Sequence, residues 1–312
     1  GLFANATLLP AIRKVAGVER VAIASPGGLH AREAARKFAF QSATSDVDAV
    51  FKDDAINTIA ILTRHDSHAE LVIQALQSGR HVFVEKPLAI HPNQLDAIRA
   101  CLEAPGRGLL LTGFNRRFAP LAGRLADFLA GRQEPLYMHY RINAGFIPAS
   151  HWVHDPAVGG GRIIGEGCHF IDLLTFLAGA APVKVHATAI PDLGRYCQDN
   201  VSMTFSFADG SLGIVDYLAN GDKSFAKERL EVFCGGRIAV LDDFRSLETV
   251  RDGRRRHEKQ AQDKGWYAEW LAFSQAIQEG GQPPIPYEQM FAVTRATFAV
   301  MDSLRSGETL PL

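Results

Sequence analysis

Short apolar runs alternate with amphipathic stretches through the first part of the chain. The runs are rich in β-branched residues and lack in-out alternation, which is typical of buried strands in a parallel sheet. Such strands are predicted at Val21–Ser25, Asn57–Thr63, His81–Glu85 and Leu109–Thr112. Helices are predicted between them at Ala31–Phe40, His68–Gly79 and Asn93–Leu102. The repeated β-α-β spacing predicts a doubly wound parallel sheet with right-handed crossovers.

The pattern changes after about Phe114, where apolar and polar residues begin to alternate. Alternating strands are predicted at 136–144, 184–189, 200–207, 211–219, 229–233 and 237–241. Asp209-Gly210 is a hairpin signal between two of them. Helices are predicted at 119–130, 266–279 and 287–304. This half therefore predicts an α+β domain with a large, mostly antiparallel open sheet, and the boundary gives domains 1–114 and 115–312. The basic run Arg251–Lys259 is expected to be a solvated loop between strand and helix.

Composition excludes several classes of protein. Hydrophobic residues make up 47% and charged residues 21% of 312 residues, with a net charge of −1. No overall electrostatic attraction to nucleic acid or to an anionic membrane is expected. No apolar run reaches the length of a membrane span, and no signal peptide is visible. The four cysteines form no C-x-x-C pair, so we expect reduced thiols in a cytoplasmic protein.

The chain opens directly on a helical pattern at Gly1-Leu2-Phe3-Ala4. These residues look like the second half of a G-x-G-x-x-G/A phosphate-binding turn, whose helix would point its N-terminus at a pyrophosphate. The alternative is an ordinary helix start. After the next strand, Ser25-Pro26-Gly27-Gly28 contains no carboxylate for a ribose hydroxyl, which leaves NADP open beside NAD, with Arg32 as a phosphate partner. A plain turn is the alternative there.

Glu85-Lys86-Pro87 ends a predicted buried strand, and ligands bind at the carboxyl ends of such strands. A lysine at that place is costly unless it is paired or has a function. Its ammonium group could polarise a substrate oxygen and stabilise a developing alkoxide. The alternative is a lysine that reaches out of a strand end into solvent.

A glycine-rich loop, Gly159-Gly160-Gly161, leads into a helix that carries His169 and Asp172 on one face. Histidine suits proton transfer near neutral pH, and a carboxylate can fix its tautomer. The alternative is a capped helix start with a core-facing histidine. The pairs His65/His68 and His151/His154 and the spacing Glu166-x-x-His169 raise a metal question, but no convergent ligand set follows from them, and we expect no metal site.

Taken together, these segments resemble the Gfo/Idh/MocA family of dehydrogenases. The matching stretches occur in the family's order: Ile61–His68, Ala75–Leu88, Gly113–Phe118 and Gly159–Asp172. The resemblance implies a Rossmann domain that binds NAD or NADP, followed by a domain for substrate binding and oligomerisation through its sheet.

The resemblance also implies site residues. The catalytic residues would be Lys86, His169 and Asp172, with His169 taking or giving the hydroxyl proton. The cofactor would be bordered by Gly1, Leu2, Phe3, Ala4, Ser25, Thr63, Arg64, His68, Glu85, Lys86, Pro87 and Asn115. A small polyhydroxylated substrate would contact Lys86, Arg116, Asn143, His151, Trp152, Glu166 and His169.

The chain departs from the family pattern at two places. Many members have Asp four residues before the histidine, where this chain has Gly165, with Glu166 one place later. The first strand and first glycine of the phosphate turn are not in the sequence, and Asn143-Ala144-Gly145, His151-Trp152 and the triple glycine look most like the C-terminal half of bacterial bi-domain oxidoreductases. Such a chain would be a fragment that lacks its first strand, or would begin at a misassigned start.

The resemblance leads to two functional hypotheses. The first is a sugar, cyclitol or nucleotide-sugar dehydrogenase, which the polar candidates of the site favour. The second, suggested by the truncated phosphate turn, is a catalytically weak or inactive family member that serves as a binding or structural subunit.

Overall fold

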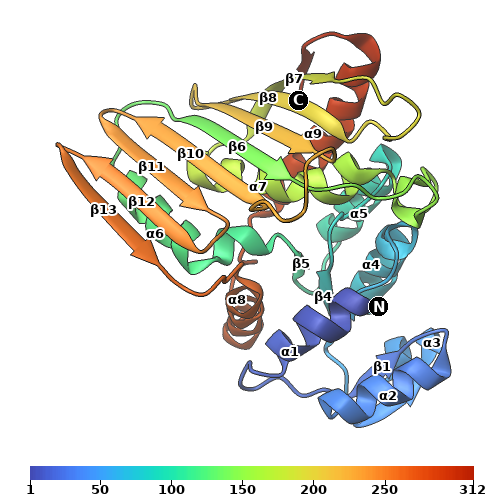
Figure 1. Cartoon of the computed structure of the whole chain (residues 1–312). Coiled ribbons are helices and arrows are strands. Elements are labelled where there is room, and N and C mark those ends of the chain that lie inside the picture. The colour runs from blue at the N-terminus through green and yellow to red at the C-terminus, as the bar shows by residue number, and fades with distance from the viewer.

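The computed structural model describes all residues from Gly1 to Leu312 and divides the strands among three sheets (Figure 1). Five strands form two small parallel sheets, β1–β2 and β3–β4–β5, which confirms the predicted Rossmann-like part. Their bounds are Ala22–Ala24, Ser42–Thr44, Thr58–Ile61, His81–Val84 and Leu110–Thr112. The intervening helices are α2 (Gly28–Phe38), α3 (Val47–Lys52), α4 (His68–Gln77) and α5 (Pro92–Glu103).

The sequence did not predict β2 and α3, because both are short. The start of α3 nevertheless has a readable signal, since Asp46 precedes it and its carboxylate accepts hydrogen bonds from the Asp48 and Ala49 amides. The chain begins in helix, with η1 (Ala4–Leu8) continued by α1 (Leu9–Ile12). Strand β1 pairs with β2 alone and not with β3, so the parallel strands do not form one continuous sheet.

The second half is built on a nine-stranded sheet, as predicted in its mostly antiparallel character. The strand order is β13-β12-β11-β10-β6-β9-β8-β7-β14, and only β6 and β9 pair in parallel. The strands span Tyr137–Asn143 (β6), Pro182–Ala189 (β7), Asn200–Phe207 (β8), Leu212–Leu218 (β9), Glu228–Cys234 (β10), Arg237–Asp242 (β11), Ser246–Arg251 (β12), Arg254–Lys259 (β13) and Leu310–Pro311 (β14).

Helices cover one face of this sheet (Figure 1). They are α6 (Pro120–Leu129), α7 (Cys168–Ala178) and α9 (Tyr287–Ser306). Alternate residues of β8, such as Met203 and Phe205, are fully buried beneath them, because successive side chains of a strand point to opposite faces. The other face remains open and exposes Tyr137, Phe233 and Ile238 by 37–42%.

The expectation of a loop at Arg251–Lys259 is wrong, because this segment is the end of β12 and all of β13. The two strands are joined at Asp252-Gly253, and both residues have positive φ, 51° and 69°. A two-residue turn of this kind matches the twist of a hairpin, and Asp-Gly is a preferred sequence for it. The charged side chains of β13 remain exposed, so an edge strand has the composition of a solvated loop.

The last two helices join the two halves into one packed body. Helix α8 (Trp266–Glu279) places Trp270 4.6 Å from Phe83 of β4, measured between ring centroids. The Leu110 amide of β5 donates to the Tyr287 hydroxyl of α9 at 3.1 Å. One core cluster of 67 buried residues spans both halves. The boundary after Phe114 therefore stays a prediction. No helix is long and apolar enough to cross a membrane.

Candidate active site

The carboxyl ends of β3, β4 and β5 meet at one edge of their parallel sheet, and they bring Thr63, Glu85 and Gly113 together there. Thr63 and Arg64 are exposed at this edge, whereas Glu85 and Pro87 are buried. The Lys86–Pro87 peptide bond is cis. The edge thus combines exposed polar side chains with a buried carboxyl group, at the place where open parallel sheets bind ligands.

Two histidines hold the loops of this edge in place. The His68 ring is fully buried, with Nδ1 2.7 Å from the Pro87 carbonyl and Nε2 3.3 Å from the Thr63 carbonyl. Burial lowers its pKa, so the ring is neutral and donates through one nitrogen only. The Pro87 carbonyl is the better acceptor of the two, because it is closer. His68, predicted to border the cofactor, therefore positions the loop after β4.

Glu85 is a buried carboxyl group without a full set of partners. Its Oε1 atom is buried and forms no hydrogen bond. Burial raises its pKa to about 7, against the opposing effect of Lys86. The carboxyl group fits because Gly113 faces it; a Cβ atom at Gly113 would lie 3.0 Å from Oε1. An orphaned acceptor at this edge suits a ligand that brings a hydroxyl group.

His169 is a buried histidine on which the charge of Lys86 acts. His169 lies in the first turn of α7 and is 8% exposed, and its Nδ1 atom is buried without a partner. Burial lowers its pKa well below the ordinary value, and the nearby Arg116, Lys86 and Lys227 charges lower it further. His169 is therefore a neutral base, and the Lys86 ammonium is one of its electrostatic neighbours. The joint role of the two residues in catalysis stays a prediction.

The triple-glycine loop packs against the loop after β3. The His65 Nδ1 atom donates to the Gly159 carbonyl at 2.8 Å, and burial lowers the His65 pKa to about 3, so the ring is neutral. The chain then enters η5 (Ile163–Gly167), a π-helix that the sequence did not predict. Gly165, where the family has Asp, lies directly against this ring; a Cβ atom there would be 2.8 Å from His65 Cε1. His65 therefore occupies the space that a side chain at position 165 would need.

Glu166 is held by partners within the chain. The Tyr217 hydroxyl donates to it at 3.0 Å, and Arg162 and Lys227 lie 3.6 and 3.7 Å away. Burial opposes ionisation, but Lys227, Lys86, Arg162 and Tyr217 together lower its pKa to about 2. Glu166 is thus a fixed anion, which does not suit it to replace a proton-transferring Asp.

Arg116, predicted to contact the substrate, has its guanidinium group engaged within the protein. Its guanidinium group binds Glu228 through two hydrogen bonds of 2.7 and 2.8 Å. The same carboxylate accepts from Lys264 Nζ at 2.7 Å and from the Tyr140 hydroxyl. We call Arg116, Tyr140, Glu228 and Lys264 the Glu228 cluster. All four side chains are buried, so the bidentate capacity of Arg116 is used inside the protein.

Asp172 also differs from the expectation. It is fully buried and accepts two hydrogen bonds from Arg117, at 3.0 and 2.5 Å, and no hydrogen bond joins it to His169. Arg117 lies in η3 (Asn115–Phe118) and also contacts Gln289 of α9. Although His169 and Asp172 are three positions apart on the same helix, their side chains have different neighbours. Asp172 binds Arg117 and thereby connects α7 with η3.

Other predicted residues have mixed outcomes. Asn115 is buried and donates to the Lys264 carbonyl at 2.7 Å. Asn143 donates to the Asp222 and Phe225 carbonyls at 2.6 and 3.2 Å, so it holds a loop. Trp152 lies edge-on to His65 at 4.8 Å and beneath the Arg64 guanidinium group at 5.4 Å. His151 is exposed.

The residues predicted to bind the cofactor phosphates, Gly1 to Ala4, are mostly exposed. Gly1, Leu2 and Phe3 are exposed, and Leu2 is 93% exposed. Ala4 is buried, and the Phe3 ring lies 6.2 Å from that of Trp266. Ser25 follows β1, and its amide donates to the Thr44 carbonyl. No described group of three His, Cys, Asp or Glu side chains could hold a metal ion.

The sequence analysis missed Glu228, Lys227 and Lys264. A signal existed for Glu228, because it shares the buried face of β10 with Leu230 and Val232 at period two. A charged residue in register with a buried face needs partners inside the protein. No comparable pattern marks the two lysines, which lie outside regular elements.

Comparison with known proteins finds relatives for both halves of the chain. Residues 1–112 match a model described as an oxidoreductase family with an NAD-binding Rossmann fold, and residues 131–236 match a GFO/IDH/MocA C-terminal domain. A D-xylose 1-dehydrogenase (NADP(+)) from Haloferax volcanii is 24% identical over 98% of this chain and 95% of its own. An inositol 2-dehydrogenase from Rhizobium meliloti is 32% identical over 54% of this chain and 52% of its own.

A solved structure agrees in fold. The oxidoreductase domain protein from Kribbella flavida superposes with a TM-score of 0.89 at 21% identity, covering 100% of this chain and 97% of the other. The predicted fold, the resemblance and the expectation of an NAD(P)-dependent dehydrogenase are confirmed at the level of the family.

Proposed function

The chain belongs to the Gfo/Idh/MocA family of oxidoreductases, and on this premise we propose that it transfers hydride between NAD(P) and a secondary alcohol carbon of a sugar, cyclitol or nucleotide-sugar. One observation carries the proposal: the buried Nδ1 atom of His169 has no partner, and the Lys86 charge contributes to the lowered pKa of this ring. A base and a cation near one point suit the removal of a hydroxyl proton and the stabilisation of the oxygen left behind.

The residues at the edge of β3 and β4 fit a nicotinamide cofactor. Glu85 offers a buried acceptor without a partner, as a ribose hydroxyl requires, and the exposed Thr63 and Arg64 border the same edge. The start of the N-terminal helix, Gly1 to Ala4, is proposed for the phosphates. NAD(P), when bound, supplies a two-electron acceptor or donor at carbon. Ser25 follows β1, where a carboxylate would favour NAD. Because Ser25 carries no charge, the preference between NAD and NADP stays open.

Lys86 and His169 divide the proton chemistry. During alcohol oxidation, His169 accepts the hydroxyl proton, which its unprotonated state permits at neutral pH. Lys86 donates to the same oxygen and stabilises the negative charge that develops there. The positive charges of Arg116, Lys86 and Lys227 make the His169 imidazolium a strong acid, so it releases its proton readily. Asp172 acts as a positioning residue that fixes α7 through Arg117.

Titration with NADH and NADPH, followed by fluorescence or calorimetry, tests the cofactor half of the proposal. Saturable binding of at least one is expected. Absence of binding by both at millimolar levels would sink the enzyme hypothesis and favour the second one, a catalytically weak family member that serves as a binding or structural subunit.

The chemical half is tested by His169→Ala and Lys86→Ala with a panel of polyols that includes D-xylose and myo-inositol. Each variant should lower turnover by about 10²–10⁴-fold while cofactor affinity changes little in His169→Ala. The exposed His30→Ala serves as the control. Unchanged turnover in either site variant would remove that residue from the mechanism.

Three further predictions stay open. We propose a homo-oligomer that pairs through the open face of the nine-stranded sheet, supported by the exposed Tyr137, Phe233 and Ile238. Sedimentation of the protein and of Phe233→Lys tests it, because a monomer in both cases would contradict it. A cytoplasmic location and a relation to bi-domain oxidoreductases also stay predictions.

A further inference from the structure

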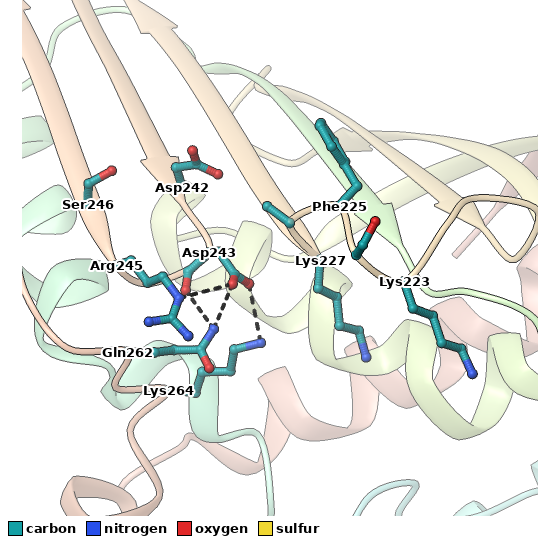
Figure 2. Close-up of a pocket in the computed structure, with 11 residues that line it drawn as sticks. Lys223, Phe225, Lys227, Asp242, Asp243, Arg245, Ser246, Gln262 and Lys264 are labelled. Atoms are coloured by element: carbon teal, nitrogen blue, oxygen red, sulfur yellow. Dashed lines mark hydrogen bonds and ion pairs between the residues drawn. The ribbon is translucent and has the colours of Figure 1, made fainter.

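A cavity of about 570 Å³ lies beside the Glu228 cluster and is lined by three segments of the second half (Figure 2). They are the loop before β10, the turn between β11 and β12, and the segment before α8. The lining contains four cationic side chains, Lys223, Lys227, Arg245 and Lys264, and two carboxylates, Asp242 and Asp243. Only two of its eleven lining residues are hydrophobic, so the cavity is polar and has an excess of positive charge.

Both carboxylates of the cavity have partners within the chain. Asp243 lies 3.5 Å from Arg245 and 3.7 Å from Lys264, and Gln262 donates to it at 2.8 Å. Figure 2 shows these four side chains drawn together on one side of the cavity. Asp242 lies 3.9 Å from Arg229, which is outside the lining. The ion pairs of both aspartates are thus formed with side chains other than Lys223 and Lys227.

Lys223 and Lys227 occupy the other side of the cavity. Both line the cavity, and Figure 2 shows both ammonium ends directed to the same side, away from Asp243. Lys223 forms no ion pair, and Lys227 has only Glu166, at 3.7 Å, which Arg162 and Tyr217 already engage. Burial lowers the pKa of Lys227, while the charges of Glu166 and Glu228 act in the opposite direction.

Lys227 connects this cavity with the proposed reaction site. Its ammonium group contacts Glu166, three residues before His169 in the chain, and its charge contributes to the lowered pKa of His169. The loop that carries Lys223 is held by Asn143, whose amide donates to Asp222 and Phe225. Lys227 thus stands on the border between the cavity and the proposed site, and Lys223 lies in the loop that Asn143 holds.

We propose that this cavity binds the anionic group of the substrate, a carboxylate or a phosphate on a polyhydroxylated carbon chain, with Lys223 and Lys227 as its ligands. The proposal rests on the proposed function, which it narrows from polyols in general to sugar acids or sugar phosphates. A neutral polyol would leave two neighbouring ammonium groups uncompensated, whereas an anion forms charge-assisted hydrogen bonds to both. The same excess charge would raise the local concentration of an anionic substrate.

Calorimetric binding to the full chain, with saturating NADH or NADPH, tests the proposal with three matched probes: D-glucose, D-gluconate and D-glucose 6-phosphate. At least one anionic probe should bind about tenfold or more tightly than D-glucose at low salt, and the advantage should shrink as salt is added. The better of the two anions identifies carboxylate or phosphate as the group recognised. Equal affinity for all three probes, or no saturable binding of either anion, overturns the proposal.

Lys223→Gln and Lys227→Gln should each lower the affinity for the preferred anion by about threefold to thirtyfold and leave that for D-glucose unchanged. Lys184→Gln, an exposed lysine of β7 at the far side of the sheet, is the matched control. Lys223 is exposed and without an ion pair, so its variant keeps the test independent of folding. Retained anion preference in both variants, or an equal loss in the control, contradicts the assignment.

The outcomes separate this proposal from the proposed function. Anion binding without hydride transfer to any tested polyol or its oxidised form would refute the dehydrogenase activity alone. Turnover of neutral polyols with no preference for their acids or phosphates would refute the anion site alone.

Discussion

Two buried glutamates, Glu228 and Glu85, have opposite surroundings. Glu228 accepts hydrogen bonds from Arg116, Lys264 and Tyr140, and these partners hold its pKa well below the ordinary range although burial opposes this. Glu85 keeps one oxygen without any partner, and burial raises its pKa to about 7. A carboxylate with all its partners inside the chain has no capacity left for a ligand. One with an unused acceptor keeps that capacity, at a cost in stability.

The same contrast divides other groups. Glu166 belongs with Glu228, because its partners keep it ionised. Glu269 of α8 belongs with Glu85: it is fully buried, both of its oxygens lack partners, and burial and the neighbouring Glu85 raise its pKa well above the ordinary value. The two unpaired glutamates, Glu85 and Glu269, lie near the carboxyl end of β4. The two paired ones, Glu166 and Glu228, lie in or against the nine-stranded sheet.

The largest expected effect is loss of stability in Glu228→Ala. Removing this carboxylate leaves Arg116 and Lys264 buried without their partner, which should lower the free energy of unfolding by about 3–5 kcal/mol. Urea unfolding at neutral pH measures it. Glu231→Ala, on the exposed face of the same strand, should change the free energy by no more than about 0.5 kcal/mol. Equal effects of the two substitutions would remove the contrast.

The next effect is a pH dependence that Glu85 confers. Its folded-state pKa is raised from 4.5 to about 7, so the unfolded state releases the proton first and stability falls as pH rises through this window. At about 1.4 kcal/mol per unit, the loss reaches roughly 3 kcal/mol by pH 8. Glu85→Gln should make the slope between about pH 5 and 7 shallower and leave the part that Glu269, whose pKa is also raised, contributes. The exposed Glu70→Gln is the control and should leave the slope in place.

A smaller effect is expected from Gly165→Ala. The new Cβ atom would lie 2.8 Å from His65 Cε1, and overpacking of this kind costs about 1–3 kcal/mol. Gly167→Ala in the same π-helix brings only an ordinary contact, 3.5 Å from Ile163, and is the matched control. The cost should shrink in a His65→Ala background. An additive double variant would refute the contact as its cause.

The smallest effect is expected from Glu269→Gln. Burial and Glu85 raise the pKa of this side chain well above its ordinary value, so in mild acid the change replaces a neutral acid by a neutral amide of nearly the same shape. The free energy of unfolding should stay within about 1 kcal/mol near pH 4, where this side chain is mostly protonated in both the folded and the unfolded chain. A loss of several kcal/mol would mean that Glu269 carries a charge and has a partner, and would move it to the paired group.

The fold could be predicted to a large extent from the sequence, and the site only in part. Buried runs and alternation have a fixed period, so the strands around Phe83 and Met203 were predictable. The paired strand β13 was not, because an exposed edge strand and a solvated loop share a charged composition. Lys86 and His169 were found through motif and strand-end position. The partners of Arg116 and Asp172 lie 112 and 55 residues away, and no local pattern encodes such pairs.

The contacts that α8 and α9 make with the first half also set an order in time. The Leu110 amide of β5 bonds to Tyr287 of α9, which lies 177 residues further along the chain. Phe83 of β4 likewise packs against Trp270 of α8. During synthesis the N-terminal sheet therefore stays incompletely covered until nearly the whole chain has left the ribosome. Closing so long a loop is slow, and apolar strands remain exposed meanwhile. The first half made is thus among the last parts to become stable, and it depends on the chain's final helices for its finished core.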